Sequence, residues 1–196
     1  MMFDLNSSYW NKRYLTDDFG WDIGTCSTPL QQYIDQLHNK ELTILIPGAG
    51  NAYEAEYLYG LGFKHVCVLD FAEEPLQRFK ERLPAFPTDQ LIAQDFFKHE
   101  GQYDLIIEQT FFCALSPELR PKYVQQMHCL LKPGGRLAGV LFNDPMNADK
   151  PPFGGSINEY RQLFEPVFKI NVLEPCYNSI KPRWGREAFI IFEKFQ

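Results

Sequence analysis

The stretch that decides the fold runs from residue 43 to residue 51 and reads T-I-L-I-P-G-A-G-N. Its first four residues are β-branched or apolar, which is typical of a strand buried on both faces of a parallel sheet. Pro47 ends this strand because it lacks the N–H that a sheet ladder requires. Gly48 and Gly50 then allow a tight turn and a close approach of the backbone to a ligand. A helix is expected next, over residues 51–61.

A second apolar run, residues 64–69, follows the helix and ends at Asp70. A carboxylate at the tip of the neighbouring strand is where a pair of ribose hydroxyls is gripped. The third glycine of a dinucleotide fingerprint is missing, because Tyr53 stands there, and this disfavours a nicotinamide enzyme. The alternative is a tight turn with an ordinary acidic strand end. Strand, turn, helix and acid in this order favour an adenosyl-cofactor site.

The composition predicts a cytoplasmic protein with one sizeable core. Of the 196 residues, 45% are apolar and 22% charged, and the net charge is −6 without a lysine/arginine cluster. Nucleic acid and membrane are therefore not expected as partners. We expect a monomer whose partner is a small molecule. Five scattered cysteines and four histidines show no disulfide or metal-ligand spacing, so no metal is expected. The N-terminus lacks a signal region, and no run of residues is long enough to span a bilayer.

Residues 42–196 alternate between expected strands and helices. The strands are expected at residues 42–46, 64–69, 90–93, 103–108 and 136–142, and the later helices at 73–83, 117–131 and 156–164. Two last strands, 167–173 and 187–194, are expected to form a closing antiparallel pair. The fold class is therefore α/β, a doubly wound, mostly parallel seven-stranded Rossmann-like sheet with helices on both faces.

Residues 1–41 are expected to form an N-terminal helical arm that folds over this core. Ser7 or Ser8 would cap a short helix through Tyr14, and Thr28 would cap a second helix. No flexible linker separates the arm from the core. We therefore expect the whole chain to be a single domain.

A ligand of such a sheet lies at the carboxyl ends of the strands, near the switch point. Among the residues at these ends, the candidates for ligand contact are Gly48, Gly50, Asp70, Asp95, Phe96 and Gln109. Each alone is more often structural than functional. Together they fit one molecule, with Asp70 on a ribose, Asp95 on the adenine amine and Phe96 along the adenine ring. The glycine turn would lie beside an amino-acid tail.

Four motifs resemble a known enzyme family. The D-F-F at residues 95–97 and the L-L-K-P-G-G at 130–135 resemble S-adenosylmethionine-dependent methyltransferases. Residues 9–30, Y-W-N-K-R-Y-L-T-D-D-F-G-W-D-I-G-T-C-S-T-P-L, resemble the front end of the thiopurine methyltransferase superfamily. The stretch T-F-F-C-A-L-S-P-E-L-R-P-K-Y, residues 110–123, is most similar to its thiol and halide methyltransferase branch. The resemblance covers nearly the whole chain and implies S-adenosylmethionine as cofactor and S-adenosylhomocysteine as product.

The resemblance also implies roles for particular residues. Trp10, Tyr14 and Trp21 match the aromatic residues of the arm that close over the cofactor. The strand-end residues would contact the cofactor, and Arg120 matches an arginine implicated at the active site of the thiopurine enzymes. Tyr14 and Gln109 replace a tryptophan and a tyrosine of the plant branch, which bears on the choice of substrate more than on the cofactor.

An aromatic arm suits a sulfonium cation, because each ring face attracts it by roughly 0.5–2 kcal/mol. The alternative is that these rings are simply core. Methyl transfer to a soft anion needs alignment and a dry pocket more than acid–base help. The expected pocket walls are Phe19, Phe111, Phe112 and Phe153. Tyr14 would orient the nucleophile.

The sequence allows alternatives for the role of Arg120 and for the function. Arg120 would attract an anion, pair with Asp17 or Asp18 of the arm, or be a helix-surface charge. A non-catalytic regulatory protein that binds the cofactor is an alternative function. A methyltransferase for an oxygen or nitrogen acceptor is another, and it would need a base such as Glu108 or His128.

Overall fold

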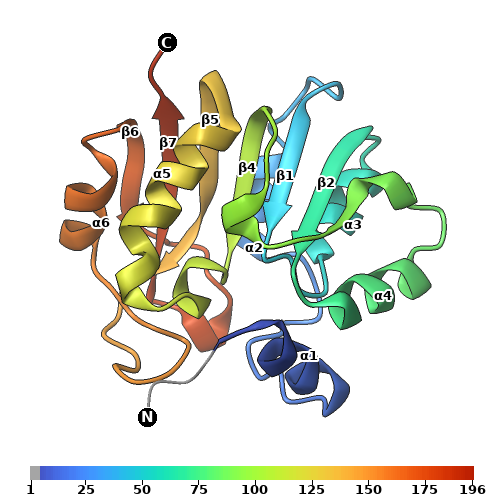
Figure 1. The fold of residues 1–196 in the computed structure, drawn as a ribbon. Helices are drawn as coiled ribbons and strands as arrows, with labels where there is room; N and C mark the ends of the chain where they lie inside the picture. The colour runs from blue at the N-terminus through green and yellow to red at the C-terminus, as the bar shows by residue number, and fades with distance from the viewer. Residues whose placement is uncertain (1–4) are drawn as a thin grey trace.

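The computed structural model describes residues 5–196 and builds them around one seven-stranded sheet (Figure 1). Its strands are β1 (Thr43–Pro47), β2 (His65–Asp70), β3 (Leu91–Ala93), β4 (Tyr103–Gln109), β5 (Leu131–Phe142), β6 (Phe168–Pro175) and β7 (Glu187–Lys194). They lie in the order β3-β2-β1-β4-β5-β7-β6. The β5–β7 and β6–β7 pairs are antiparallel and the other pairs are parallel. This confirms the expected mostly parallel sheet with an antiparallel pair at its end.

Helices cover both faces of the sheet, which explains why β1 is apolar at successive positions. Ile44 and Ile46 pack into one core with α2 (Thr28–Ile34), α3 (Tyr53–Gly60) and α4 (Glu73–Arg82). Leu45 points the other way, into the core formed with α5 (Arg120–Leu130) and α6 (Ile157–Phe164). Successive side chains of a strand alternate between faces, so a strand covered on both sides must be apolar throughout.

The topology creates a switch point beside β1. This strand pairs with β2 on one side and with β4 on the other, so the chain runs outward to β3 and then returns to β4. The connections diverge at the carboxyl ends of β1 and β4, where ligands bind in sheets of this kind.

The arm lies across these carboxyl ends, where α1 (Ser7–Leu15) packs beside α4 (Figure 1). The Asn11 side-chain oxygen accepts a hydrogen bond from the backbone N–H of Glu74 at 2.9 Å. The Arg78 guanidinium donates to the Tyr14 carbonyl at 2.7 Å and to the Asp17 carboxylate at 3.0 Å. The arm is thus fixed to the core by polar bonds as well as by packing.

The residues that cap the first two helices differ from the expected ones. Asn6, not Ser7 or Ser8, caps α1 by accepting from the Tyr9 N–H at 3.0 Å. Ser27 rather than Thr28 stands at the N-cap of α2.

Two boundaries also shift. A single 3-10 turn occupies Pro117–Leu119, so α5 begins later than expected. β5 begins at Leu131, because residues 132–135 loop out between its pairings with Tyr103 and Leu105. Within residues 5–196 no helix is long and apolar enough to cross a membrane.

Candidate functional site

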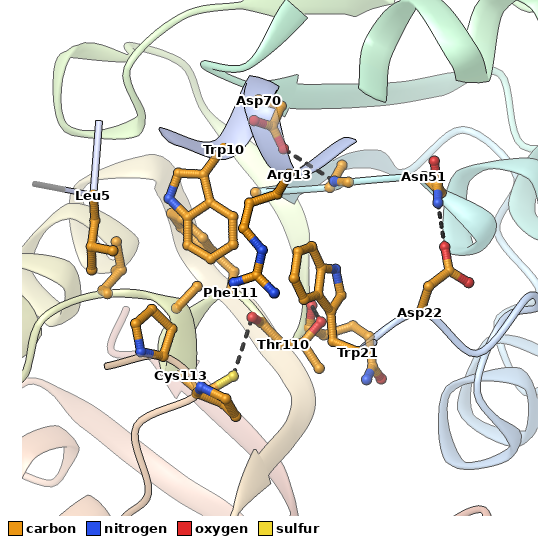
Figure 2. A pocket seen from close by; sticks show the side chains of 18 of the residues that line it. Leu5, Trp10, Arg13, Trp21, Asp22, Asn51, Asp70, Thr110, Phe111 and Cys113 are labelled. Carbon is orange, nitrogen blue, oxygen red and sulfur yellow. Dashed lines mark hydrogen bonds between the residues drawn. The ribbon is translucent and has the colours of Figure 1, made fainter. Parts of the chain in front are cut away.

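A cavity of about 760 Å³ opens at the carboxyl ends of β1 to β4, beneath α1 (Figure 2). Its walls come from the glycine turn after β1, the ends of β2 and β4, the segments 94–97 and 110–119, and the arm. Residues of the loop after β5 and of the segment before β7 complete it. The cavity therefore lies at the switch point, as the sequence predicts.

Glycine is required twice in the turn after β1. Gly48 and Gly50 have φ angles of +56° and +52°, in the left-handed region that other residues rarely adopt. A Cβ atom on Gly48 would lie 2.1 Å from the Phe111 ring, and one on Gly50 would lie 2.5 Å from the Tyr14 hydroxyl. The turn thus brings backbone atoms directly against the cavity walls.

Asp70 is held in place by the same turn. One carboxylate oxygen accepts from the Gly50 N–H at 3.1 Å and the other from the Ala72 N–H at 2.9 Å. Burial raises the Asp70 pKa to about 6, although these N–H groups act to lower it. A carboxylate has about four acceptor positions, so the bonds to the backbone leave room for two ribose hydroxyls.

Asp95 and Phe96 lie next to each other at the end of β3. One carboxylate oxygen of Asp95 accepts from the Phe97 N–H at 2.9 Å, and among the described residues no donor reaches its other oxygen. The buried Phe96 ring meets Phe111 edge to face, with 5.1 Å between ring centroids. This pair offers one acceptor and one flat apolar surface, which suits an adenine.

Gln109 ends β4 and carries an unsatisfied donor. Its side-chain oxygen accepts from the Ser27 hydroxyl at 2.9 Å. Its amide nitrogen is buried and has no hydrogen-bond partner in residues 5–196. A buried unpaired donor costs about 1–3 kcal/mol. Other atoms of Gln109 line the cavity.

The three aromatic residues predicted in the arm line the cavity together. The Trp10 and Trp21 rings lie 5.5 Å apart, and the Tyr14 ring is 6.0 Å from that of Trp21. Burial raises the pKa of the Tyr14 hydroxyl far above its usual range. The Arg13 guanidinium lies between the two indoles in Figure 2, 4.7 Å from the Trp21 ring centroid, and bonds to Asp18.

Glu108 shapes the loop after β4 instead of facing the cavity. One of its carboxylate oxygens accepts from the Phe111 and Phe112 N–H groups, and the Tyr123 hydroxyl donates to the other. Complete burial raises the Glu108 pKa to about 7. Thr110, a β-branched residue with φ +60°, begins this tight loop. His128 packs against a different strand, so neither suggested base lines the cavity.

Four residues expected at the acceptor pocket do not line the cavity: Phe19, Phe112, Phe153 and Arg120. Phe19 stacks on Tyr14 from outside, and Phe112 lies in the core against Tyr123 and Tyr160. Phe153 is buried, and its N–H donates to the Cys113 carbonyl. Of the expected walls, only Phe111 faces the cavity.

Arg120 pairs within the core and not with the arm. It forms an ion pair with Glu159 and donates to the Gly154 carbonyl at 2.6 Å. The expected partners are engaged elsewhere, because Asp17 pairs with Arg78 and Asp18 with Arg13. Arg120 therefore fastens the loop after β5 to α5 and α6.

Several residues of the cavity escaped the sequence reasoning. Glu54 lines it from the first turn of α3, although it is only 5% exposed. Arg183 lines it from the segment before β7 and donates to the Trp21 carbonyl at 2.6 Å. Cys113 also lines it, and burial raises the pKa of its thiol to about 12. One feature of the sequence could have identified Glu54: it is an acid in the first turn of the helix that follows the glycine turn.

Comparison with known proteins places this geometry in a family. A family profile described as Thiopurine S-methyltransferase (TPMT) matches residues 5–196. The chain belongs to the thiopurine S-methyltransferase family. The predicted family, enzyme class and cofactor are thereby confirmed.

Curated relatives of this family member include plant and bacterial proteins. "Probable thiol methyltransferase 2" of Arabidopsis thaliana is 28% identical over 193 residues, which cover 95% of this chain and 85% of the relative. "Thiocyanate methyltransferase 1" of Brassica oleracea is 27% identical, with 91% and 81% covered. "Thiopurine S-methyltransferase" of Vibrio campbellii is 25% identical, with 96% and 99% covered.

Solved structures show the same fold at low identity. A Burkholderia thailandensis 1,6-didemethyltoxoflavin-N1-methyltransferase, solved with S-adenosylhomocysteine, matches with a TM-score of 0.75 and 16% identity. The match covers 98% of this chain and 88% of that one. The sheet order and helical layers are thus those of S-adenosylmethionine-dependent methyltransferases.

Proposed function

We propose that this enzyme transfers the methyl group of S-adenosylmethionine to a small soft nucleophile such as a thiolate, bisulfide, thiocyanate or halide. The observation that carries the proposal is a single cavity in which Asp70, Asp95 and the glycine turn lie beneath three aromatic rings. The names of the plant and bacterial relatives support the acceptor class.

Different residues of the cavity would bind different parts of the cofactor. Asp70 would hold the ribose hydroxyls, and Asp95 with Phe96 would hold the adenine. The indoles of Trp10 and Trp21 would lie over the positive sulfur, which favours the sulfonium and keeps water away.

The cavity extends beyond these residues, which favours an enzyme over a non-catalytic binding protein. Its lining also includes apolar residues that the cofactor assignment does not use, namely Leu115, Leu119, Phe142, Met146 and Pro151. Apolar walls of this kind would strip water from an anion, and a partly desolvated anion reacts faster with a cationic sulfonium. We propose this part as the acceptor pocket.

The ionisable groups near the pocket suit a nucleophile that arrives already charged. Burial raises the pKa values of the Cys113 thiol and the Tyr14 hydroxyl, so both keep their protons at neutral pH. Asp18 bonds to Arg13, and Asp22 bonds to Asn51 and Tyr53. An oxygen or nitrogen acceptor would need a base, and the suggested Glu108 is buried behind the loop.

The bound cofactor supplies a methyl carbon attached to a positively charged sulfur. In the proposed transfer the anion would form a bond to that carbon as the carbon–sulfur bond breaks, and the bonding pair would stay on sulfur as a neutral thioether. No proton moves in this step. The residues of the cavity therefore contribute alignment and exclusion of water.

Calorimetry with S-adenosylmethionine and S-adenosylhomocysteine, followed by an acceptor screen, tests the proposal. Bisulfide, thiocyanate, iodide and an aromatic thiol should be methylated in the screen. Binding of the cofactor without any methylated product would favour the non-catalytic alternative. We also propose a cytoplasmic monomer that does not act on nucleic acid, in line with the net charge of −6; light scattering would test the oligomeric state.

A further inference from the structure

A guanidinium group stands inside the cavity, close to where the proposed function puts the sulfonium of the cofactor. Arg13 comes from α1, lines the cavity and lies between the Trp10 and Trp21 indoles, with 4.7 Å between its Cζ atom and the Trp21 ring centroid (Figure 2). With the cofactor bound, two positive charges would share one pair of aromatic rings. Like charges at such short range repel each other.

The Arg13 guanidinium keeps donors that protein groups do not use. Its Nε donates to the Asp18 carbonyl at 2.8 Å, one Nη to the Asp18 carboxylate at 3.1 Å, and the other Nη to the Tyr9 hydroxyl at 3.0 Å. A guanidinium has five N–H donors, so two of them have no hydrogen-bond partner among residues 5–196. These two are available to a ligand in the cavity.

Asp18 neutralises the Arg13 charge only weakly. The Asp18 side chain is 67% exposed, so water competes with this ion pair, and exposed pairs contribute little. The other two arginines of the described cavity lining pair with carboxylates that are at most 24% exposed, Glu187 and Asp144. A small anion therefore competes more easily for Arg13 than for these two arginines.

An anionic acceptor needs a positive charge of this kind. The apolar residues proposed as the acceptor pocket, among them Leu115 and Phe142, would remove water from the anion. An anion taken out of water is stable only when a cation or several donors compensate for the lost hydration. The sulfonium would supply one positive charge, and Arg13 beside it supplies a second. An anion that lies between the two also cancels their mutual repulsion.

We propose that Arg13 is a specificity-determining residue, which selects anionic acceptors by binding them between its guanidinium and the methyl group of the cofactor. This inference rests on the proposed function, since it assumes that the cofactor lies in this cavity. The anion loses its negative charge as it bonds to the methyl carbon and the carbon–sulfur bond breaks, with the bonding pair going to sulfur. The attraction to Arg13 is therefore strongest before the transition state, and it acts on KM more than on kcat.

Steady-state kinetics with thiocyanate, bisulfide and iodide at constant ionic strength test the proposal. Arg13→Met removes the charge and keeps an unbranched side chain against the Trp21 ring. The KM for each methylated anion should rise at least about tenfold, because a charge-assisted hydrogen bond is lost, whereas kcat should stay within about threefold. Asp18→Asn should instead lower the KM, because it removes the carboxylate that competes with the anion for Arg13. Damage to the fold would not produce these two opposite changes.

Lys12→Met is the matched control. Lys12 precedes Arg13 on α1 but is exposed and lies outside the cavity lining, so its loss should leave the KM unchanged. Calorimetry with S-adenosylhomocysteine separates anion selection from a purely structural role, because a loosened arm would weaken this ligand, whereas the proposal leaves its Kd unchanged in Arg13→Met.

Three results with Arg13→Met would each overturn the inference: KM values like those of the wild type, a loss of kcat in place of a rise in KM, or weaker binding of S-adenosylhomocysteine. A higher KM in Asp18→Asn would overturn it as well. A wild-type protein that methylates none of the three anions would instead contradict the proposed function itself.

Discussion

Replacing Asp70 by asparagine should separate stability from cofactor binding. The carboxyl accepts the N–H groups of Gly50 and Ala72 and is 9% exposed. Burial raises its pKa from 3.8 to about 6, so the folded protein holds this proton more tightly than the unfolded chain. The tighter binding of this proton therefore stabilises the folded state. This contribution to the free energy of unfolding is complete below pH 4 and is lost as the pH rises through 6.

The magnitude follows from the shift. A change from 3.8 to about 6 corresponds to about 3 kcal/mol of unfolding free energy that the wild type loses between pH 4 and pH 8. Asp70→Asn avoids this loss, but its amide group must face one of the two backbone N–H groups with a donor, at a cost of about 1–3 kcal/mol. Near pH 8 the two proteins should therefore differ by less than about 2 kcal/mol.

Cofactor affinity should respond much more strongly. The amide offers one acceptor where the carboxylate offers two, and it carries no charge. Losing one charge-assisted bond to a ribose hydroxyl and weakening the other costs about 3 kcal/mol, on the order of a hundredfold in Kd.

Urea unfolding from pH 4 to pH 8 and calorimetry with S-adenosylhomocysteine measure the two effects. The stability of Asp70→Asn minus that of the wild type should rise by about 3 kcal/mol across this range. A flat difference would refute the buried-charge argument. A Kd within threefold of the wild type would refute the placement of the ribose.

Three further predictions concern the turn, the aromatic arm and the core. Gly50→Ala should destabilise the protein by at least about 1–2 kcal/mol in urea unfolding, because φ of Gly50 is +52° and the new Cβ would meet Tyr14. The control Gly60→Ala should not destabilise the protein in this way, because a Cβ at Gly60 lies in open space. Trp21→Leu should weaken S-adenosylmethionine binding about 2–30-fold more than S-adenosylhomocysteine binding, since only the former carries the cation; equal losses would mean that the indole merely packs. Arg120→Lys should lower the free energy of unfolding by about 2 kcal/mol, because the bonds to Glu159 and Gly154 are lost, but it should leave the Kd for S-adenosylhomocysteine unchanged. Weaker binding of S-adenosylhomocysteine by this variant would place Arg120 at the cofactor.

The sheet and the cofactor residues could be predicted from the sequence because their signals are local. Strand ends follow from short apolar runs, and in a parallel sheet those ends meet at one edge. Gly48, Asp70 and Gln109 could thus be brought together without knowledge of any side-chain contact. The arm could be placed only through its resemblance to a family.

The walls of the acceptor pocket could not be predicted in this way. Phe111 and Phe112 are neighbours, yet one faces the cavity and the other the core. The choice depends on Glu108, whose carboxylate accepts both of their N–H groups and fixes the turn. Arg120 likewise finds its partner Glu159 on another helix, a contact that no local pattern encodes.

The two guanidinium groups that grip the arm have a consequence for turnover. Arg78 of α4 donates to the Tyr14 carbonyl, and Arg183 before β7 donates to the Trp21 carbonyl, so the arm is held to the core at two points. Each of these charged hydrogen bonds contributes about 1.5–3 kcal/mol. Together they make full opening of the arm on the order of 10²–10⁴ times rarer than it would be without them. We therefore expect release of S-adenosylhomocysteine, which requires the arm to open, to contribute to the rate of the catalytic cycle.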